Sequence, residues 1–128
     1  MSRLLIIDDD SAIRWVLQRN LEHSGFSVVT AENGLDGLSK IGESTPDLVV
    51  LDLMMPVMDG FGVLEALRSD PITSRIPVIV LTAVAATEMQ ARCLQAGARR
   101  VMTKPFEPSR LTDAINDLLD EPATKAIG

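Results

Sequence analysis

Acidic, hydroxyl and amino side chains stand at the ends of four short apolar runs in this sequence. They are Asp8-Asp9-Asp10, Asp52, Thr82 and Lys104. Carboxylates that lie close together repel one another and resist ionisation unless a cation compensates their charge. Mg²⁺ suits such a set, because it prefers oxygen ligands, keeps several waters and accepts phosphate oxygens. These residue types therefore indicate a site for a divalent cation and a phosphoryl group.

The same residues supply what the transfer of a phosphoryl group to a carboxylate requires. A carboxylate such as Asp52 is ionised at neutral pH and can attack phosphorus without a general base. Because the transferred group resembles metaphosphate, catalysis consists mostly of positioning and charge neutralisation. The cation, the Lys104 ammonium and the Thr82 hydroxyl would each take one phosphoryl oxygen. The expected product is an acyl phosphate on Asp52.

Five predicted β-α units bring these side chains together. Continuous apolar or β-branched runs predict parallel strands, buried on both faces, at residues 4–7, 26–30, 48–51, 78–81 and 99–102. Helical spacing of apolar residues predicts helices at residues 11–24, 35–43, 60–69, 86–96 and 108–119. Short connections between these elements indicate an α/β domain with a central parallel sheet and helices on both faces. Ligands bind at the carboxyl ends of such strands, so the polar side chains should converge there.

Local signals mark where several of these helices begin and end. Asp10 or Ser11 can cap the first helix, and Gly25 is expected to end it; Asp10 is interpreted as a helix cap rather than a metal ligand. Asp59 is expected in the turn before Gly60, and Gly97 at the end of the fourth helix. These acidic residues are therefore assigned to local structure and not to the site.

The bulk properties are those of one ordinary domain. The chain has 128 residues and a formal net charge of −6, which argues against a nucleic-acid-binding surface as its main role. Its single cysteine excludes an internal disulfide framework. No apolar run approaches the length of about 18 residues that predicts a membrane span, and the N-terminus lacks a signal-peptide layout. A cytoplasmic domain at residues 1–120 is expected, with residues 121–128 as a tail or linker stub.

Four motifs in order resemble the receiver domain of two-component response regulators. They are Asp8-Asp9, the run from Asp52 to Gly60 (DLMMPVMDG), Thr82-Ala83 and Lys104-Pro105-Phe106. The resemblance covers residues 3–120, and it is specific because all four motifs follow predicted strands. It implies a flavodoxin-like, doubly wound (βα)5 fold, with a parallel sheet in the order 2-1-3-4-5. It also implies a phosphorylation-dependent signalling switch.

The resemblance assigns a role to each matching residue. Asp52 becomes the phosphoacceptor, and the metal, Mg²⁺, is bound by Asp9, Asp52, the backbone carbonyl of Met54 and, often through water, Asp8. Thr82 becomes the switch hydroxyl and Lys104 the phosphate-binding lysine. The Lys104-Pro105 peptide bond is expected to be cis. Such a protein is a phosphoacceptor that assists its own phosphotransfer and dephosphorylation, not an enzyme acting on a separate substrate.

The implied partners are proteins. A sensor histidine kinase or a histidine-phosphotransfer protein supplies the phosphoryl group, and a downstream effector protein or domain reads the result. Direct binding of nucleic acid and membrane insertion are not expected.

Two positions depart from the family pattern. An aromatic residue usually stands three residues before the lysine and rotates inward on activation, but here this residue is Val101, and the chain has no tyrosine. A muted or rerouted rearrangement of the fourth helix, fifth strand and fifth helix is therefore predicted. Met54 and Val84 occupy the positions that tune the lifetime of the acyl phosphate. Because neither orients an attacking water well, slow self-hydrolysis is expected.

Trp15 allows two interpretations. It lies off the apolar face of the first helix, near the predicted active edge, where a phosphotransfer partner would approach. It is either a docking anchor for that partner or a ring lying flat over neighbouring side chains. His23 and Cys93 are interpreted as an ordinary surface residue and an ordinary helix residue.

Three other functions fit parts of the pattern. An aspartate-nucleophile phosphohydrolase would carry a second Asp two residues after Asp52, where Met54 stands. A flavin-binding electron carrier would need glycine- and hydroxyl-rich phosphate contacts after the first strand, where three Asp residues stand. A receiver fold used only for docking is disfavoured by the full acidic set with Thr82 and Lys104. Turnover of a phosphomonoester would indicate the phosphohydrolase. Failure to incorporate phosphate would indicate the receiver fold used only for docking.

Overall fold

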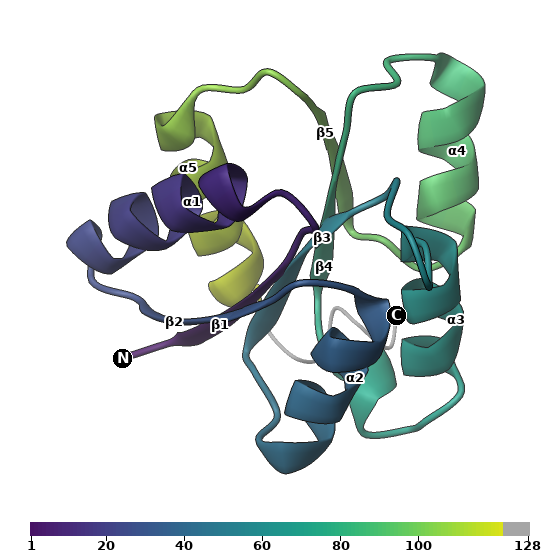
Figure 1. Cartoon of the computed structure of the whole chain (residues 1–128), viewed down its shortest axis with the longest axis horizontal. Coiled ribbons are helices and arrows are strands. Elements are labelled where there is room, and N and C mark those ends of the chain that lie inside the picture. The colour runs from purple at the N-terminus through teal and green to yellow at the C-terminus, as the bar shows by residue number, and fades with distance from the viewer. Residues whose placement is uncertain (122–128) are drawn as a thin grey trace.

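The computed structural model describes residues 1–121, which alternate between strands and helices (Figure 1). The strands are Arg3–Ile7 (β1), Ser27–Ala31 (β2), Leu48–Asp52 (β3), Val78–Thr82 (β4) and Arg100–Thr103 (β5). The α-helices are Ser11–His23 (α1), Gly34–Glu43 (α2), Gly60–Arg68 (α3), Thr87–Gln95 (α4) and Pro108–Leu119 (α5). A short 3₁₀ turn, Thr73–Arg75 (η1), precedes β4 and was not predicted from the sequence.

The five strands form one parallel sheet in the order β2-β1-β3-β4-β5. The predicted fold class and strand order are therefore confirmed. The chain leaves β1 toward β2 on one side and returns to β3 on the other, so the strand order reverses between β1 and β3. In doubly wound sheets the ligand site lies at this switch point, outside the carboxyl ends of the strands.

Helices cover both faces of the sheet, as Figure 1 shows. One face packs against α1 and α5 through a core cluster that includes Ile6, Leu17 and Ile115. The other face packs against α2, α3 and α4 through a cluster that includes Ile7, Val63 and Cys93. Successive side chains of a strand point to opposite faces, so an unbroken apolar run supplies both cores at once.

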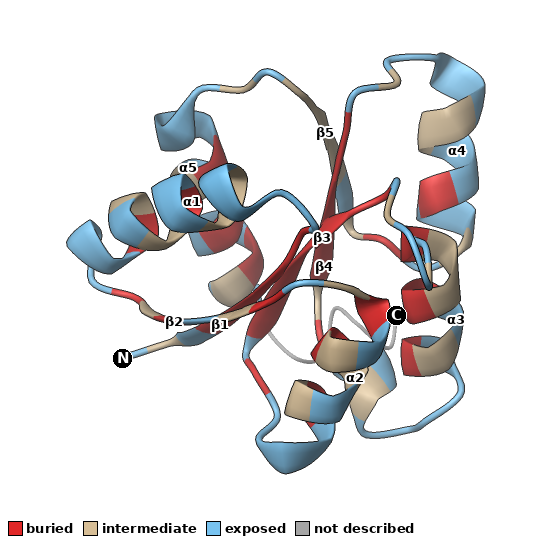
Figure 2. Ribbon diagram, in the orientation of Figure 1, coloured by how far each residue is buried: buried red, intermediate tan, exposed pale blue. Residues whose placement is uncertain are grey.

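Burial follows the position of each strand in the sheet. The inner strands β3 and β4 are buried along their whole length, and β1 is buried after its first residue. The edge strand β5 has no fully buried residue, and the other edge strand, β2, is buried at only two positions. The prediction that all five strands are buried on both faces is therefore wrong for the two edges, which have a neighbouring strand on one side only. Figure 2 shows the contrast between β4 and the partly exposed β5.

The ends of the helices agree with the local sequence signals. The Asp10 carboxylate caps α1 by accepting from two backbone N–H groups, and the Asp59 carboxylate caps α3 by accepting from the Gly62 N–H. Gly25 and Gly97 follow α1 and α4 with φ of +98° and +115°, a backbone region that favours glycine. Of the expected tail, residues 122–128 lie outside the described part of the chain. Among the described residues, no helix is both long enough and apolar enough to cross a membrane.

Candidate functional site at the carboxyl edge of the sheet

The register of the strands places the predicted residues side by side. Ile7 pairs with Leu51, so Asp8 and Asp52 follow adjacent positions of β1 and β3. Asp52 pairs with Leu81, which puts Thr82 one residue beyond it on β4. Thr82 in turn pairs with Thr103, the residue before Lys104. The sheet therefore gathers four chain segments at one edge, as the sequence predicted.

Three carboxylates form the centre of the site. Asp8, Asp9 and Asp52 each place one oxygen within 4.8 Å of the other two. Asp8 and Asp52 are buried, with 1% and 6% of their surface exposed, whereas Asp9 faces solvent. Oxygen ligands with one open side match the chemistry of Mg²⁺, which retains water when it binds. The residues present therefore fit a divalent cation.

Lys104 supplies the positive charge among these groups. Its Nζ lies 3.2 Å from Asp8 Oδ2 and 3.2 Å from Asp52 Oδ1, so one ammonium bridges two buried carboxylates. Burial by itself lowers the pKa of Lys104, but the charges of Asp8 and Asp52 outweigh this and raise it above its ordinary value. The lysine therefore stays protonated. With three carboxylates and one ammonium, the site keeps an excess of negative charge that suits a divalent cation.

Asp52 is the carboxylate whose ionisation is most altered. Burial, followed by the charge of Asp8, raises its pKa to about 6, although Lys104 acts in the opposite direction. Without a cation, the Asp52 carboxylate is therefore partly protonated just below neutral pH. A bound cation favours the ionised form and would bring the pKa down.

Thr82 is fully buried at the end of β4. Its Oγ1 accepts a hydrogen bond of 3.1 Å from the Val84 N–H, which closes a tight turn after the strand. A hydroxyl can donate as well as accept. Thr82 therefore places a hydroxyl at the same edge of the sheet as Asp52.

The loop after Asp52 is shaped by close backbone packing. A side chain at Gly60 would come within 3.0 Å of the Asp52 carbonyl oxygen and 2.9 Å of the Leu53 Cα, so only glycine fits there. Val57 has φ of +71°, and the Met58 N–H donates to the Pro56 carbonyl across it at 2.8 Å. This is a γ-turn of the strained kind, with a β-branched residue at its centre. No residue pattern around Val57 indicated this strained turn.

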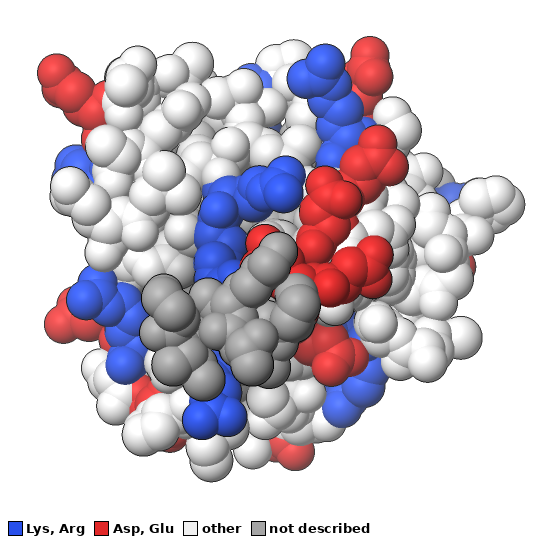
Figure 3. Space-filling model, turned by 180° about the vertical axis from the view of Figure 1, so that it is seen from behind, with Lys and Arg blue, Asp and Glu red and all other residues white. Residues whose placement is uncertain are grey.

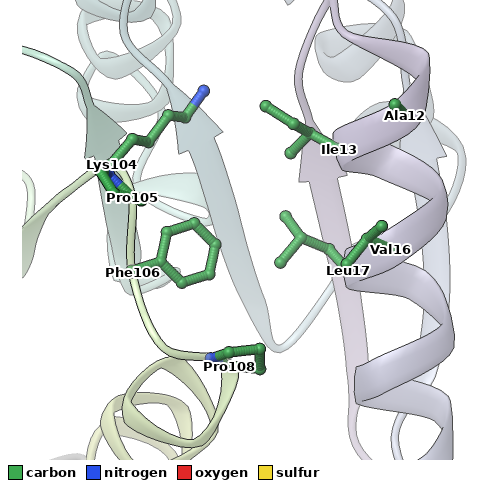
Figure 4. Close-up of a pocket in the computed structure, with 8 residues that line it drawn as sticks. All are labelled: Ala12, Ile13, Val16, Leu17, Lys104, Pro105, Phe106 and Pro108. Carbon is green, nitrogen blue, oxygen red and sulfur yellow. The ribbon is translucent and has the colours of Figure 1, made fainter.

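The β5–α5 loop carries Lys104 toward the site. The Lys104-Pro105 bond is cis, which confirms the prediction. Figure 4 shows an apolar cavity between this loop and α1, with the Phe106 ring directed toward Ile13 and Leu17. The cavity has a volume of about 470 Å³ and opens beside Lys104. An apolar recess therefore adjoins the charged site.

The remaining predicted residues lie outside this centre. Trp15 on α1 is 60% exposed, and the Arg19 guanidinium lies 4.8 Å from its ring centroid. The Met54 side chain is 65% exposed at the rim of the site. Val101 on β5 is partly buried against the core on the α3–α4 side. Cys93 is fully buried in the same core, which agrees with its interpretation as an ordinary helix residue.

Arg14 belongs to the site but was not predicted from the sequence. Its guanidinium donates a hydrogen bond of 2.7 Å to the backbone carbonyl of Asp8. Side chains of an α-helix point back toward its N-terminus, so a long residue in the first turns of α1 can reach the β1–α1 loop. That rule is a general signal that could have indicated Arg14, although it does not choose the atom to which the side chain binds.

The fold and the acidic site at its switch point are those of a signal-receiver domain. The sequence model of the response regulator receiver domain matches residues 4–116, so the chain belongs to this family. Receiver domains are phosphorylation-dependent switches of two-component signalling, and this chain is such a domain rather than a classical enzyme.

Curated relatives and experimental structures agree with this assignment. The chain is 40% identical over 119 residues to the DNA-binding dual master transcriptional regulator RpaA of Synechocystis sp., covering 93% of this chain and 49% of that protein. It is likewise 40% identical over 117 residues to the transcriptional regulatory protein PrrA of Mycobacterium tuberculosis, covering 91% of this chain and 49% of PrrA. The chain therefore spans about half the length of these relatives.

The fold matches receiver domains of known structure over their whole length. A CheY-like response regulator receiver domain protein from Methanospirillum hungatei superposes with a TM-score of 0.89 at 32% identity, covering 98% of each chain. The chemotaxis protein CheY4 of Vibrio cholerae gives a TM-score of 0.87 at 30% identity, covering 92% of this chain and 98% of that one.

Proposed function

We propose that Asp52 accepts a phosphoryl group from a phosphohistidine and that this modification changes a partner-binding surface. The donor would be a sensor histidine kinase or a histidine-phosphotransfer protein. The observation that carries the proposal is the bridging of Asp8 and Asp52 by Lys104, 3.2 Å from each, beside a third carboxylate. This arrangement supplies a nucleophile, a cation site and a charge that can follow the phosphoryl group.

In the transfer, a carboxylate oxygen of Asp52 attacks phosphorus while the bond from phosphorus to the imidazole nitrogen breaks. The electron pair of that bond stays on the imidazole, whose other ring nitrogen carries a proton in the phosphohistidine, so the ring leaves as neutral imidazole. Lys104 then moves its contact from Asp52 Oδ1 to a phosphoryl oxygen and keeps its contact with Asp8. Thr82 donates its hydroxyl to a second phosphoryl oxygen. Each residue thus neutralises charge without a proton transfer at the nucleophile.

We propose Mg²⁺ as the cation, held by Asp9, Asp52 and the backbone carbonyl of Met54, with Asp8 close by. When bound, Mg²⁺ would neutralise the charge of the phosphoryl oxygens. Asp8 is buried and paired with Lys104, whereas Asp9 faces solvent. This difference supports Asp9 as the direct ligand and Asp8 as the more distant one.

The donor is proposed to dock over α1 and the β5–α5 loop. The apolar cavity between Ile13 and Phe106 opens next to Lys104 and could receive an apolar side chain of the donor (Figure 4). Trp15 remains a candidate anchor, because the residue is 60% exposed even though the Arg19 guanidinium lies over its ring. Unchanged phosphotransfer kinetics after Trp15→Ala would remove Trp15 from the docking surface.

The output is proposed to be a protein contact made by the phosphorylated domain, with residues 1–120 as the folded unit. RpaA is named as a DNA-binding regulator, but the matched region is only half of it. On the face seen in Figure 3, acidic and basic side chains lie beside one another. Together with the net charge of −6, this supports an effector protein or domain as the reader. A cytoplasmic location stays part of this proposal.

The acyl phosphate is proposed to be long-lived and to be lost by self-hydrolysis. The exposed Met54 side chain and the apolar Val84 flank the site, and neither orients an attacking water by a strong hydrogen bond. A half-life of only seconds would contradict this expectation.

The central assignment can be tested with a small-molecule phosphodonor and MgCl₂. Intact mass should rise by one phosphoryl group, and peptide mapping should locate that group on Asp52. Asp52→Asn should abolish the modification, whereas Asp59→Asn, in the same loop but serving as a helix cap, should retain it. Phosphate persisting on Asp52→Asn would overturn the assignment.

A further inference from the structure

We propose that Arg14 is a positioning residue that fixes the peptide between Asp8 and Asp9 and so holds Asp9 ready to bind Mg²⁺. This inference rests on the proposed Mg²⁺ site. Arg14 lies in the first turns of α1, and its Nη1 donates to the Asp8 carbonyl oxygen at 2.7 Å in partly buried surroundings. The short distance and the charge of the donor mark a strong hydrogen bond.

Asp8 is held by its neighbours at each of its other polar atoms. Its N–H donates to the Ala31 carbonyl at 3.1 Å, which continues the ladder between β1 and β2. One carboxylate oxygen accepts from the Asp10 N–H at 2.9 Å, and the other lies 3.2 Å from Lys104. The carbonyl is the remaining polar group of Asp8, and Arg14 holds it.

That carbonyl controls the direction in which Asp9 leaves the strand. The Asp8 carbonyl and the Asp9 nitrogen belong to one rigid peptide plane. Asp9 is the exposed member of the acidic cluster, so fewer packing contacts fix it than fix the buried Asp8 and Asp52. A peptide plane held by a planar guanidinium would keep the Asp9 carboxylate aimed into the cluster.

Two roles of Arg14, positioning the Asp8–Asp9 peptide and acting through its charge alone, predict opposite changes in Mg²⁺ affinity when Arg14 is replaced. Removing a positive charge close to a cation site should tighten Mg²⁺ binding if the charge acts only through space. Releasing the Asp8–Asp9 peptide should weaken it, and outer contacts that orient metal ligands typically contribute about 10- to 100-fold in affinity. The direction of the change in Mg²⁺ affinity therefore separates the two roles.

The test is calorimetric titration of the unphosphorylated chain with MgCl₂. Arg14→Met should weaken Mg²⁺ binding by about tenfold while leaving far-ultraviolet circular dichroism unchanged. Arg19→Met is the matched control, because it removes the same charge five residues further along α1, from a side chain that lies over Trp15. Its Mg²⁺ affinity should stay within about twofold of the original chain or become slightly tighter, as expected for a screened, exposed charge.

Unchanged or tighter Mg²⁺ binding by Arg14→Met would overturn the role of Arg14. If Arg14→Met does not fold, Arg14→Lys decides, because lysine keeps the charge but lacks the fixed guanidinium geometry. Binding at least threefold weaker than that of Arg19→Met would then support the inference, and equal binding would overturn it. Absence of Mg²⁺ binding by the original chain would instead contradict the Mg²⁺ site itself.

Discussion

At the scale of single residues, Asp52 shows how a functional site costs stability. Burial and the charge of Asp8 raise its pKa from 3.8 to about 6. The folded state therefore retains a proton on Asp52 at pH values where the unfolded chain has released it. It follows that the free energy of unfolding falls as pH rises through this window.

The non-titrating variant Asp52→Asn should reveal this cost. In EDTA, the variant should exceed the original chain by on the order of 1–3 kcal/mol at pH 7.5, and the gain should shrink toward pH 4.5. Urea unfolding at the two pH values measures the difference. A variant that is less stable at pH 7.5, or a gain that does not change with pH, would contradict this account of Asp52.

The residues at the strand ends were predictable because the rule that places them is local. Asp8, Asp52 and Thr82 each end an apolar run, and a parallel sheet brings such ends together wherever the runs lie in the sequence. The bond from Arg14 to the Asp8 carbonyl was not predictable in the same way. It depends on the angle at which α1 leaves the loop, and no pattern of residue types records that angle.

At the scale of elements, the β3–α3 connection holds Asp52 in place through one close approach between the backbone at Gly60 and the backbone at Asp52 and Leu53. A methyl group at Gly60 would meet the Asp52 carbonyl at 3.0 Å and the Leu53 Cα at 2.9 Å. Neither atom lies at the end of a flexible side chain, so relief requires the strand end and the helix start to separate. The start of α3 is therefore coupled to the position of Asp52.

Gly60→Ala should accordingly lower both stability and phosphorylation. We expect a loss of about 1–3 kcal/mol, as for other overpacked sites, together with slower incorporation of phosphate. Gly42→Ala is the control, because a methyl group at Gly42 in α2 meets no atom within 4 Å. It should stabilise the chain by about 0.5–1 kcal/mol through helix propensity. If Gly60→Ala and Gly42→Ala had equal stability and incorporated phosphate at equal rates, the close backbone contact at Gly60 would not constrain the site.

The elements themselves were predicted to within a few residues, and the errors have physical causes. The inner strands β3 and β4 follow unbroken apolar runs, because both faces of these strands are buried in the core. The edge strand β5 (RVMT) has a weaker pattern, because solvent reaches one side of it. The strained turn at Val57 escaped prediction because residues in the left-handed region are usually glycine or asparagine.

At the scale of the whole molecule, a bound cation should link the carboxyl edge to global stability. A ligand that binds only the folded state adds about 1.4 kcal/mol at ten times its dissociation constant. MgCl₂ should therefore raise the thermal midpoint, and EDTA should reverse the rise. Asp9→Asn should abolish most of it, while Asp10→Asn, which keeps a capping oxygen for α1, should not. Equal midpoint shifts in the two variants would argue against Asp9 as a ligand.

The face expected to rearrange on phosphorylation is formed by α4, β5 and α5. A cavity of about 370 Å³ lies there beside Val101, Gln90 and Phe106. Valine cannot swing a large ring between the core and this cavity, as an aromatic residue at the same position would. Under the proposed function, the charge added at Asp52, about −1.5 to −2, is therefore expected to produce a muted or rerouted rearrangement of this face.

Amide chemical shifts with and without beryllofluoride, a mimic of the phosphoryl group, test this expectation. Shifts should be large around residues 52–60 and 82–86 and small along β5 and α5. Val101→Tyr should enlarge the shifts on β5 and α5, because the added ring can occupy the cavity in one state and leave it in the other. Val101→Ile, which adds volume without a ring, should not. Shifts on β5 and α5 of the original chain as large as those beside Asp52 would show that the signal crosses the sheet without an aromatic switch.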